Sequence, residues 1–286
     1  MNLPDRTLEH LCEVVTQPDL AGTQYELIDF MGRGGMGAVY RVRDTRLDRL
    51  VALKVLDFPE SVPAEARLLA QLEHPSIVPV YDAGTLPDGR PYFAMRLVEG
   101  VRLDVLLRQP RTLSERLSLF EKICEAVAFA HNRGVIHRDL KPENIMIGAF
   151  GEVAVLDWGV AVWREAGGRN VAGTPHFMAP EQAAGGPVDR RTDIYALGLL
   201  LNEILGGTAP KPLAAIAAQA SSASPDARYA SVELVLADLR RYQDRLPVLA
   251  YRESIGERTL RFAARNNVLL LLLGAYIAVR VLLFFL

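Results

Sequence analysis

The stretch HRDLKPENIMI, His137 to Ile147, decides how the rest of this sequence is interpreted. It places a carboxylate at Asp139, an ammonium group at Lys141 and an amide at Asn144 within a few residues. A second carboxylate, Asp157, follows in VAVLDWG, which ends at Gly159. These residue types can act as a base, as a counter-charge for an anion and as oxygen ligands of a hard cation, so the stretch marks a candidate reactive site.

Upstream lies a glycine-rich loop between two strand-like runs. Gly32, Gly34 and Gly37 form G-x-G-x-x-G, a weak signal by itself because a tight hairpin or a dinucleotide site also uses it. A dinucleotide site needs a helix directly after the glycines, whereas AVYRVRD continues as a strand. The pattern therefore favours a hairpin whose backbone can lie close over phosphate groups.

Lys54 lies 17 residues beyond Gly37 in the apolar strand pattern VALKV. A buried lysine requires a partner, and Glu65, in the helical pattern from Pro63 to Leu72, is the expected one. Such a pair would direct the ammonium group at phosphate oxygens. For Lys54 taken alone, a lysine on an exposed strand face is the alternative.

The chain from about Tyr25 to Leu246 resembles the eukaryotic-type protein serine/threonine kinase family of bacteria. It contains the motifs of that family in the same order: G-x-G-x-x-G-x-V, VALK, HRDLKPEN and DWG. The resemblance implies transfer of the γ-phosphate of ATP to Ser or Thr of protein substrates, with Mg²⁺, or alternatively Mn²⁺, as the metal. It makes Asp139 the base that orients the incoming hydroxyl and Lys141 the cation near the transferred phosphate. The metal ligands that it implies are Asn144 and Asp157.

The resemblance also implies a nucleotide site, in which Met95 to Val98 connect two lobes. Its members are Met31, Gly32, Arg33, Gly34, Gly35, Met36, Gly37, Val39, Ala52, Lys54, Met95, Val98 and Met146, beside a catalytic set of Asp139, Lys141, Lys54 and Glu65. Val39, Ala52 and Met146 are expected around the adenine ring, although each of them taken singly is better explained as ordinary core.

Further matches imply structural roles. Glu181 of Ala-Pro-Glu is expected to pair with Arg228, and Asp193 to brace the catalytic loop. Trp158 replaces the usual Phe after the metal-binding Asp and is expected to pack near His137.

Between Asp157 and Thr174 the sequence contains no Ser, Thr or Tyr. The stretch therefore cannot carry an activating phosphate, so Arg138 lacks its usual ligand and Glu165 is a candidate weak substitute. We predict that activity does not depend on phosphorylation there. Thr174 resembles the family threonine that contacts the catalytic base.

The distribution of patterns predicts an α+β chain with a two-lobed, protein kinase-like fold. Short apolar runs broken by Gly, Pro and Asp-Gly predict an antiparallel sheet lobe over about 25–98, and mainly helical patterns predict the second lobe over about 99–246. The helical lobe is shortened, since little chain separates the helix ending near Gly207 from PDARY. Residues 1–24 form an N-terminal extension and 247–267 a juxtamembrane segment.

Val268 to Leu286 is apolar except for Arg280 and, at about 1.5 Å per residue, could cross roughly 28 Å of hydrocarbon. We predict a transmembrane tail anchor over 268–286, with a buried C-terminal helix as the alternative. The arginines at 252, 258, 261 and 265 precede it, which predicts a single-pass membrane protein whose catalytic domain is cytoplasmic.

Composition limits the remaining function classes. The 286 residues carry 32 basic and 34 acidic side chains, so no overall basic field indicates nucleic acid. Met1 to Asp19 lacks a signal-peptide pattern, and Cys12 and Cys124 indicate neither a disulfide framework nor a zinc site.

Two alternatives stay open beside an active kinase acting on protein substrates of unknown identity. A pseudokinase or ATP-binding scaffold at the membrane is favoured by the shortened helical lobe and opposed by the complete set of Lys54, Asp139, Asn144 and Asp157. A small-molecule kinase usually lacks the Lys-Pro-Glu and Ala-Pro-Glu runs found here. A homodimer is also left open.

Overall fold

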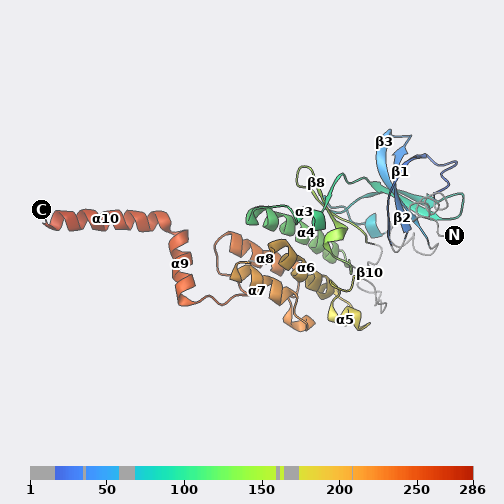
Figure 1. The fold of residues 1–286 in the computed structure, drawn as a ribbon. Helices are drawn as coiled ribbons and strands as arrows, with labels where there is room; N and C mark the ends of the chain where they lie inside the picture. The colour runs from blue at the N-terminus through green and yellow to red at the C-terminus, as the bar shows by residue number, and fades with distance from the viewer. Residues whose placement is uncertain are drawn as a thin grey trace, which may run out of the picture.

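The computed structural model describes residues 17–34, 37–57, 68–158, 162–163, 174–207 and 209–285. A lobe built on a sheet is followed by a lobe built mainly of helices, which confirms the predicted two-lobed α+β fold (Figure 1). The first lobe contains a five-stranded antiparallel sheet of order β1-β2-β3-β5-β4. Its strands are β1 (Tyr25–Gly34), β2 (Gly37–Asp44), β3 (Arg49–Leu56), β4 (Val80–Thr85) and β5 (Pro91–Arg96).

Strand alternation gives this sheet two different faces. On one face Tyr40, Leu53 and Ala94 belong to a compact apolar cluster of the small lobe. On the other face the register places Val39 opposite Lys54, and Lys54 opposite Phe93. Because successive side chains of a strand point to opposite faces, the residues that build the core and those that face the second lobe come from the same three strands.

The second lobe is helical with two small sheets, β6-β8-β9 and β10-β7. Its elements are β6 (Gly100–Arg102), α3 (Leu103–Leu106), α4 (Leu113–Asn132), β7 (Val135–Ile136), η1 (Pro142–Asn144), β8 (Ile145–Gly148), β9 (Val153–Val155), β10 (Val162–Trp163), α5 (Pro180–Ala183), α6 (Arg190–Leu205), α7 (Lys211–Ala220), η2 (Pro225–Ala227) and α8 (Val232–Gln243). The free thiol of Cys124 is buried within α4.

Local chemistry explains where α4 and α6 begin and where α6 ends. At the start of α4, Thr112 and Glu115 form a reciprocal capping box that satisfies two otherwise unpaired backbone N–H groups. At the start of α6, the Asp189 side chain accepts from the backbone N–H of Arg191. Gly206 ends α6 in the left-handed region, at φ 61°, which glycine adopts without steric cost.

A buried ion pair ties α5 to the region before α8. Arg228 donates to both carboxylate oxygens of Glu181, at 2.7 and 2.8 Å, and also to the carbonyl oxygens of Arg191, Ser222 and Ala223. Its side chain is fully buried. The pairing expected from the sequence is therefore present, and the guanidinium satisfies several backbone carbonyls as well.

Two further helices follow the second lobe, α9 (Ile255–Arg265) and α10 (Asn267–Phe285). Figure 1 shows α10 pointing away from both lobes, with α9 running across its direction. Among the residues that the structure describes, no helix is long and apolar enough to cross a membrane. The helical pattern predicted from Pro63 to Leu72 falls largely outside the described residues, which resume at Leu68.

We expect Arg228→Met to lower the free energy of unfolding by about 3 to 5 kcal/mol, because it leaves the Glu181 carboxylate without its partner. Urea unfolding followed by circular dichroism measures the change. Arg43→Met is the matched control, since Arg43 pairs with Asp48 at the exposed surface and should change stability by less than about 1 kcal/mol. Equal effects of the two substitutions would contradict a structural role for the buried pair.

Candidate active site

A cavity of about 720 Å³ lies between the sheet lobe and the helical lobe. Of the predicted nucleotide-binding residues it is lined by Met31, Gly34, Gly37, Val39, Ala52, Lys54, Met95, Val98 and Met146. Gly32 and Arg33 do not line it; the guanidinium of Arg33 instead pairs with Asp57 at 2.6 Å. Gly35 and Met36 lie outside the described residues.

The loop glycines differ in why they are needed. At Gly37, φ is 150° and an added Cβ would lie 2.1 Å from the carbonyl oxygen of Val55, so the neighbouring strand excludes any side chain. At Gly32 and Gly34 an added Cβ would meet nothing within 4 Å. The protein itself therefore requires glycine at Gly37, whereas a requirement at Gly34 would have to come from a bound group.

Lys54 is joined to the second lobe by an ion pair. Its Nζ donates to Asp157 Oδ1 at 3.0 Å and lies 5.6 Å from the centre of the Phe93 ring. Burial raises the pKa of the Asp157 carboxyl, but the Lys54 ammonium more than offsets this and holds the pKa below its usual value. Asp157 is thus kept ionised. The predicted Lys54–Glu65 pair lies outside the described residues, because Glu65 does.

Asp139 is oriented through both carboxylate oxygens. Oδ1 accepts from the backbone N–H and the hydroxyl of Thr174, at 2.7 and 2.9 Å. Oδ2 accepts from Lys141 Nζ at 2.8 Å and from Asn144 Nδ2 at 3.1 Å. Lys141 Nζ also donates to Thr174 Oγ1 at 2.6 Å. The expected contact between Thr174 and Asp139 is therefore present, and it joins the catalytic loop to the segment before α5.

The loop that carries Asp139 is held in place by hydrogen bonds to Asp193 of α6. Its buried carboxylate accepts from the backbone N–H groups of His137 and Arg138, both at 2.8 Å, and lies 2.8 Å from His131 Nε2. Burial raises the pKa of Asp193, but the hydrogen bond and charge interaction with His131, then the charge interaction with His137 and the Arg138 N–H group, hold the pKa below its usual value. The bracing expected of Asp193 is thus a pair of backbone hydrogen bonds.

Two more side chains fix the same loop. His137 packs on Trp158 with ring centres 4.5 Å apart, as expected, and its Nε2 lies 3.0 Å from the Leu156 carbonyl oxygen. Gln182 is buried and donates from Nε2 to the Arg138 carbonyl oxygen at 2.8 Å. Gln182 was not identified from the sequence, since its partner lies 44 residues away and no local pattern indicates the contact.

Sequence reasoning also missed part of the apolar wall. Phe93, Val78 and Leu69 line the cavity. Phe93 could have been found, because it stands two residues before Met95 on β5 and so shares its face. Leu69 belongs to the helical pattern predicted from Pro63 to Leu72, but that pattern alone does not show that it reaches the cavity. Val78 lies outside the strands of the sheet, and no periodic pattern includes it.

The residue types in the cavity fit a divalent cation shared with a phosphate. Asn144 Nδ2 donates hydrogen bonds to the carbonyl oxygen and the carboxylate of Asp139. Asn144 Oδ1 is therefore the atom of this side chain that would bind a cation. Within the described ranges no group of three or more His, Cys, Asp or Glu could hold a metal by itself. A cation here would therefore take Asp157, Asn144, substrate oxygens and water, as Mg²⁺ commonly does.

Comparison with known proteins agrees with this arrangement. The sequence profile described as protein kinase domain matches residues 25–234. Serine/threonine-protein kinase PknD of Chlamydia muridarum is 39% identical over 230 residues, covering 64% of this chain and 24% of the relative. Serine/threonine-protein kinase PknB of Mycobacterium tuberculosis is 40% identical over 215 residues, covering 68% of this chain and 34% of the relative. The match thus covers only about a quarter to a third of these relatives' length.

We expect Gly37→Ala to lower the free energy of unfolding by about 1 to 3 kcal/mol, because its Cβ collides with β3. Gly34→Ala is the matched control and should stay within about 0.5 kcal/mol of the unchanged chain, since its Cβ enters open space. Thermal and urea unfolding measure both. A loss of stability in Gly34→Ala as large as that in Gly37→Ala would contradict the assignment.

Proposed function

The chain belongs to the protein kinase family, and we propose that it is a protein serine/threonine kinase that uses ATP and a divalent cation. The observation that carries the proposal is the convergence of Lys54, Asp139, Lys141, Asn144 and Asp157 on one cavity between the lobes. The names of the relatives, all serine/threonine-protein kinases, support the choice of protein hydroxyl groups as acceptors.

Phosphoryl transfer depends mainly on positioning and on neutralising charge, and the cavity offers both. Lys54 and Lys141 bring two ammonium groups to the place where the phosphates of ATP would lie. A bound Mg²⁺ or Mn²⁺ would be held by Asp157 and Asn144 and would neutralise phosphate charge. Val39, Ala52 and Met146 form an apolar slot of the kind that fits a planar adenine ring.

Asp139 would accept the proton of the incoming Ser or Thr hydroxyl. A carboxylate has about four lone-pair positions, and here four donors occupy them, from Thr174, Lys141 and Asn144. A substrate hydroxyl therefore has to displace one donor. Lys141 is the one best able to leave, because it keeps Thr174 as a partner and would gain the transferred phosphate.

The central test is transfer of labelled phosphate from ATP, with Mg²⁺, to the chain itself and to a generic basic protein. Asp139→Asn is expected to lower the rate by at least about 10²-fold while nucleotide binding is kept, because the amide cannot accept the proton. Asp244→Asn, an exposed substitution of the same kind at the end of α8, is the matched control and should be fully active.

Two outcomes would overturn the proposal. If the unchanged chain and Asp139→Asn are equally silent while both bind nucleotide, an ATP-binding scaffold is the better description. If phosphate passes to a small molecule and to no protein, the chain is a small-molecule kinase.

The catalytic loop is also proposed to be set without a phosphate in the segment between Asp157 and Thr174, which contains no Ser, Thr or Tyr. Asp193 and Gln182 support this, because they fix the backbone on both sides of the Arg138 residue by hydrogen bonds within the protein. The suggested substitute charge, Glu165, lies outside the described residues.

We therefore expect protein treated with a phosphatase to keep its activity within about twofold. The measurement is the initial rate before and after treatment, with complete removal of phosphate checked by mass spectrometry. A drop of more than about tenfold would show that a phosphate elsewhere in the chain is needed to order the site.

We further propose that α10 attaches the catalytic domain to a membrane, with that domain in the cytoplasm. The large apolar side chains described on this helix are all more than half exposed: Leu272, Tyr276, Ile277, Val279, Val281, Leu283 and Phe284. The four arginines that precede the helix support the cytoplasmic side by the positive-inside rule.

A further inference from the structure

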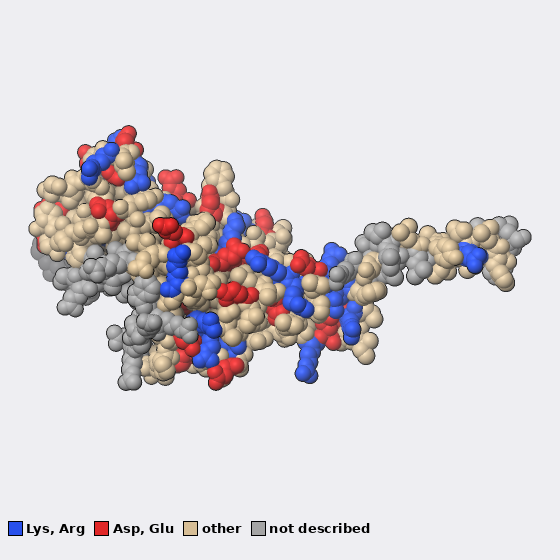
Figure 2. Space-filling view, turned by 180° about the vertical axis from the view of Figure 1, so that it is seen from behind, with Lys and Arg blue, Asp and Glu red and all other residues tan. Residues whose placement is uncertain are grey.

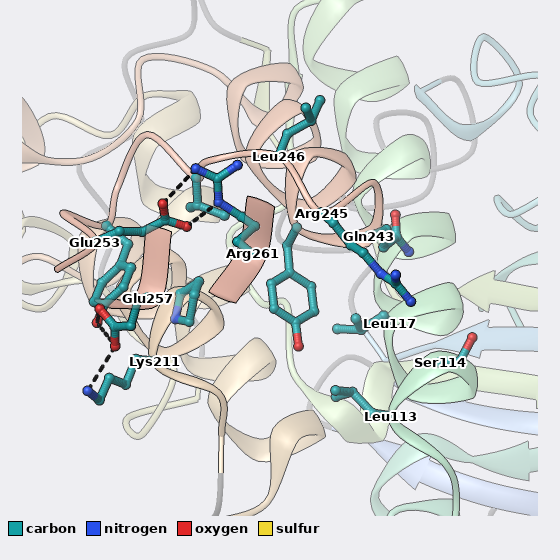
Figure 3. A pocket seen from close by; sticks show the side chains of 14 residues that line it. Leu113, Ser114, Leu117, Lys211, Gln243, Arg245, Leu246, Glu253, Glu257 and Arg261 are labelled. Atoms are coloured by element: carbon teal, nitrogen blue, oxygen red, sulfur yellow. Dashed lines mark hydrogen bonds and ion pairs between the residues drawn. The ribbon is translucent and has the colours of Figure 1, made fainter. Parts of the chain in front are cut away.

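Helix α9 turns charged residues toward the kinase domain. Glu257 accepts from Lys211 Nζ of α7 at 3.0 Å and from the Tyr251 hydroxyl at 2.9 Å. Arg261, one turn further along, donates to both carboxylate oxygens of Glu253, at 2.7 and 2.8 Å. Figure 3 shows both groups of contacts, and because Glu257 and Arg261 are four residues apart they share one face of the helix. The polar side of α9 thus faces protein.

The space beneath α9 agrees with this orientation. A cavity of about 680 Å³ separates the helix from α4, α7 and the end of α8 (Figure 3). Of the α9 side chains that the structure describes, Glu257 and Arg261, both charged, line its wall. The described apolar side chains of α9 do not reach this cavity, so they are not packed against the domain through it.

The opposite side of α9 is apolar and exposed. Ile255 is 85% exposed and Phe262 is 58% exposed, and a spacing of seven residues places them on one stripe of the helix. Leu249, on the approach to α9, is also largely exposed. A helix at a protein surface normally buries its apolar stripe, whereas this described pair of apolar side chains on α9 is exposed.

We propose that the outer face of α9, defined by Ile255 and Phe262, lies in the surface of an anionic lipid bilayer. The inference rests on the proposed attachment through α10. The apolar pair would enter the boundary between headgroups and acyl chains, and the exposed Arg252 and Arg258 would meet lipid phosphates.

The junction between the two helices supports this occupant. Asn266 ends α9, with its Nδ2 on the Phe262 carbonyl oxygen at 2.9 Å, and α10 begins at the next residue. Because α9 runs across the direction of α10 (Figure 1), a bilayer entered by α10 would bring α9 along its surface. In Figure 2 basic side chains gather, among some acidic ones, at the end of the body from which this tail leaves.

A second copy of the chain fits the same face less well. In a two-fold symmetric contact each copy presents the same patch to the other. Arg258, which is exposed and lies three residues after Ile255 and four before Phe262 on α9, would then be brought toward its own counterpart and repel it. An anionic lipid surface instead complements the charge of Arg258.

The tail is fastened to the domain, so the contact would orient the whole kinase. The buried carboxylate of Asp238 accepts from the backbone N–H groups of Leu249 and Ala250, at 2.8 and 3.0 Å, and from the Tyr229 hydroxyl at 2.9 Å. The α7 and α8 end of the domain would face the bilayer. The sheet lobe lies at the far end of the molecule from α10 (Figure 1) and would point into the cytoplasm.

The test uses the full chain in vesicles whose lipids carry bromine either near the headgroup or near the chain end, and reads quenching of one added tryptophan. Three apolar positions of similar exposure are substituted in turn: Phe262→Trp on α9 (58%), Leu272→Trp on α10 (66%) and Leu47→Trp in the sheet lobe (63%). The quenching measured for the unsubstituted chain, which contains two tryptophans of its own, is subtracted from each value. We expect strong quenching at 262 by headgroup bromines, at 272 by chain-end bromines, and none at 47.

The outcomes separate the proposals. Quenching at 272 without quenching at 262 overturns the inference on α9 and keeps the membrane attachment. Absence of quenching at both positions overturns both. Shielded emission at 262 without quenching means that protein covers the face, which also overturns the inference. Phosphate transfer assayed in the same vesicles shows separately whether the catalytic proposal fails.

The lipid charge is tested in the Phe262→Trp chain. Arg258→Glu is expected to reduce quenching at 262 at least twofold in anionic vesicles and to leave it unchanged in zwitterionic ones. Arg43→Glu, an exposed arginine of the sheet lobe, is the control and should change neither. Unchanged quenching in anionic vesicles would exclude an anionic lipid surface as the partner.

Discussion

The arrangement of the site depends on one buried carboxylate. Asp193, on α6, accepts the backbone N–H groups of His137 and Arg138 and fixes the loop in a conformation that puts Arg138 at φ 71°. A non-glycine residue in this region is strained and persists only where surrounding bonds hold it. Gln182 supplies a further such bond at the Arg138 carbonyl oxygen. Asp139 follows directly, so its direction is set before any ligand binds.

Hydrogen bonds and ion pairs connect this loop to the rest of the helical lobe and to the sheet lobe. Asp139 binds Thr174, which joins the loop to the chain that leads into α5, and α5 is in turn held by the Glu181–Arg228 pair. Across the cavity Asp157 binds Lys54 of β3. Each link is an ionic or charge-assisted hydrogen bond, and the Glu181–Arg228 pair is largely shielded from water, whereas Asp157 stays open to the cavity. The cavity is therefore pre-shaped by the protein for an anionic ligand and its cation.

The described part of the tail after α8 combines paired charges with exposed apolar side chains. On α9 the charged Glu257 and Arg261 pair on the side that faces the domain, and Ile255 and Phe262 are exposed. The backbone bonds to Asp238 help to keep the tail in place. In the proposed arrangement, these polar contacts leave Ile255 and Phe262 free to enter the bilayer surface. They also fix the orientation of the domain relative to the bilayer.

The sequence by itself determined the order of the two lobes through its strand and helix patterns, and the family and the polar members of the cavity through the resemblance that its motifs carry. Local pattern and resemblance predicted four residues of the nucleotide site that the structure places at the cavity: Val39, Ala52, Lys54 and Met95. Only the tertiary structure showed Gln182 on the Arg138 carbonyl, the two backbone bonds to Asp238 and the outward apolar face of α9. An amphipathic pattern defines two faces of a helix, but which face meets the domain is decided by partners distant in the chain, such as Lys211 for Glu257.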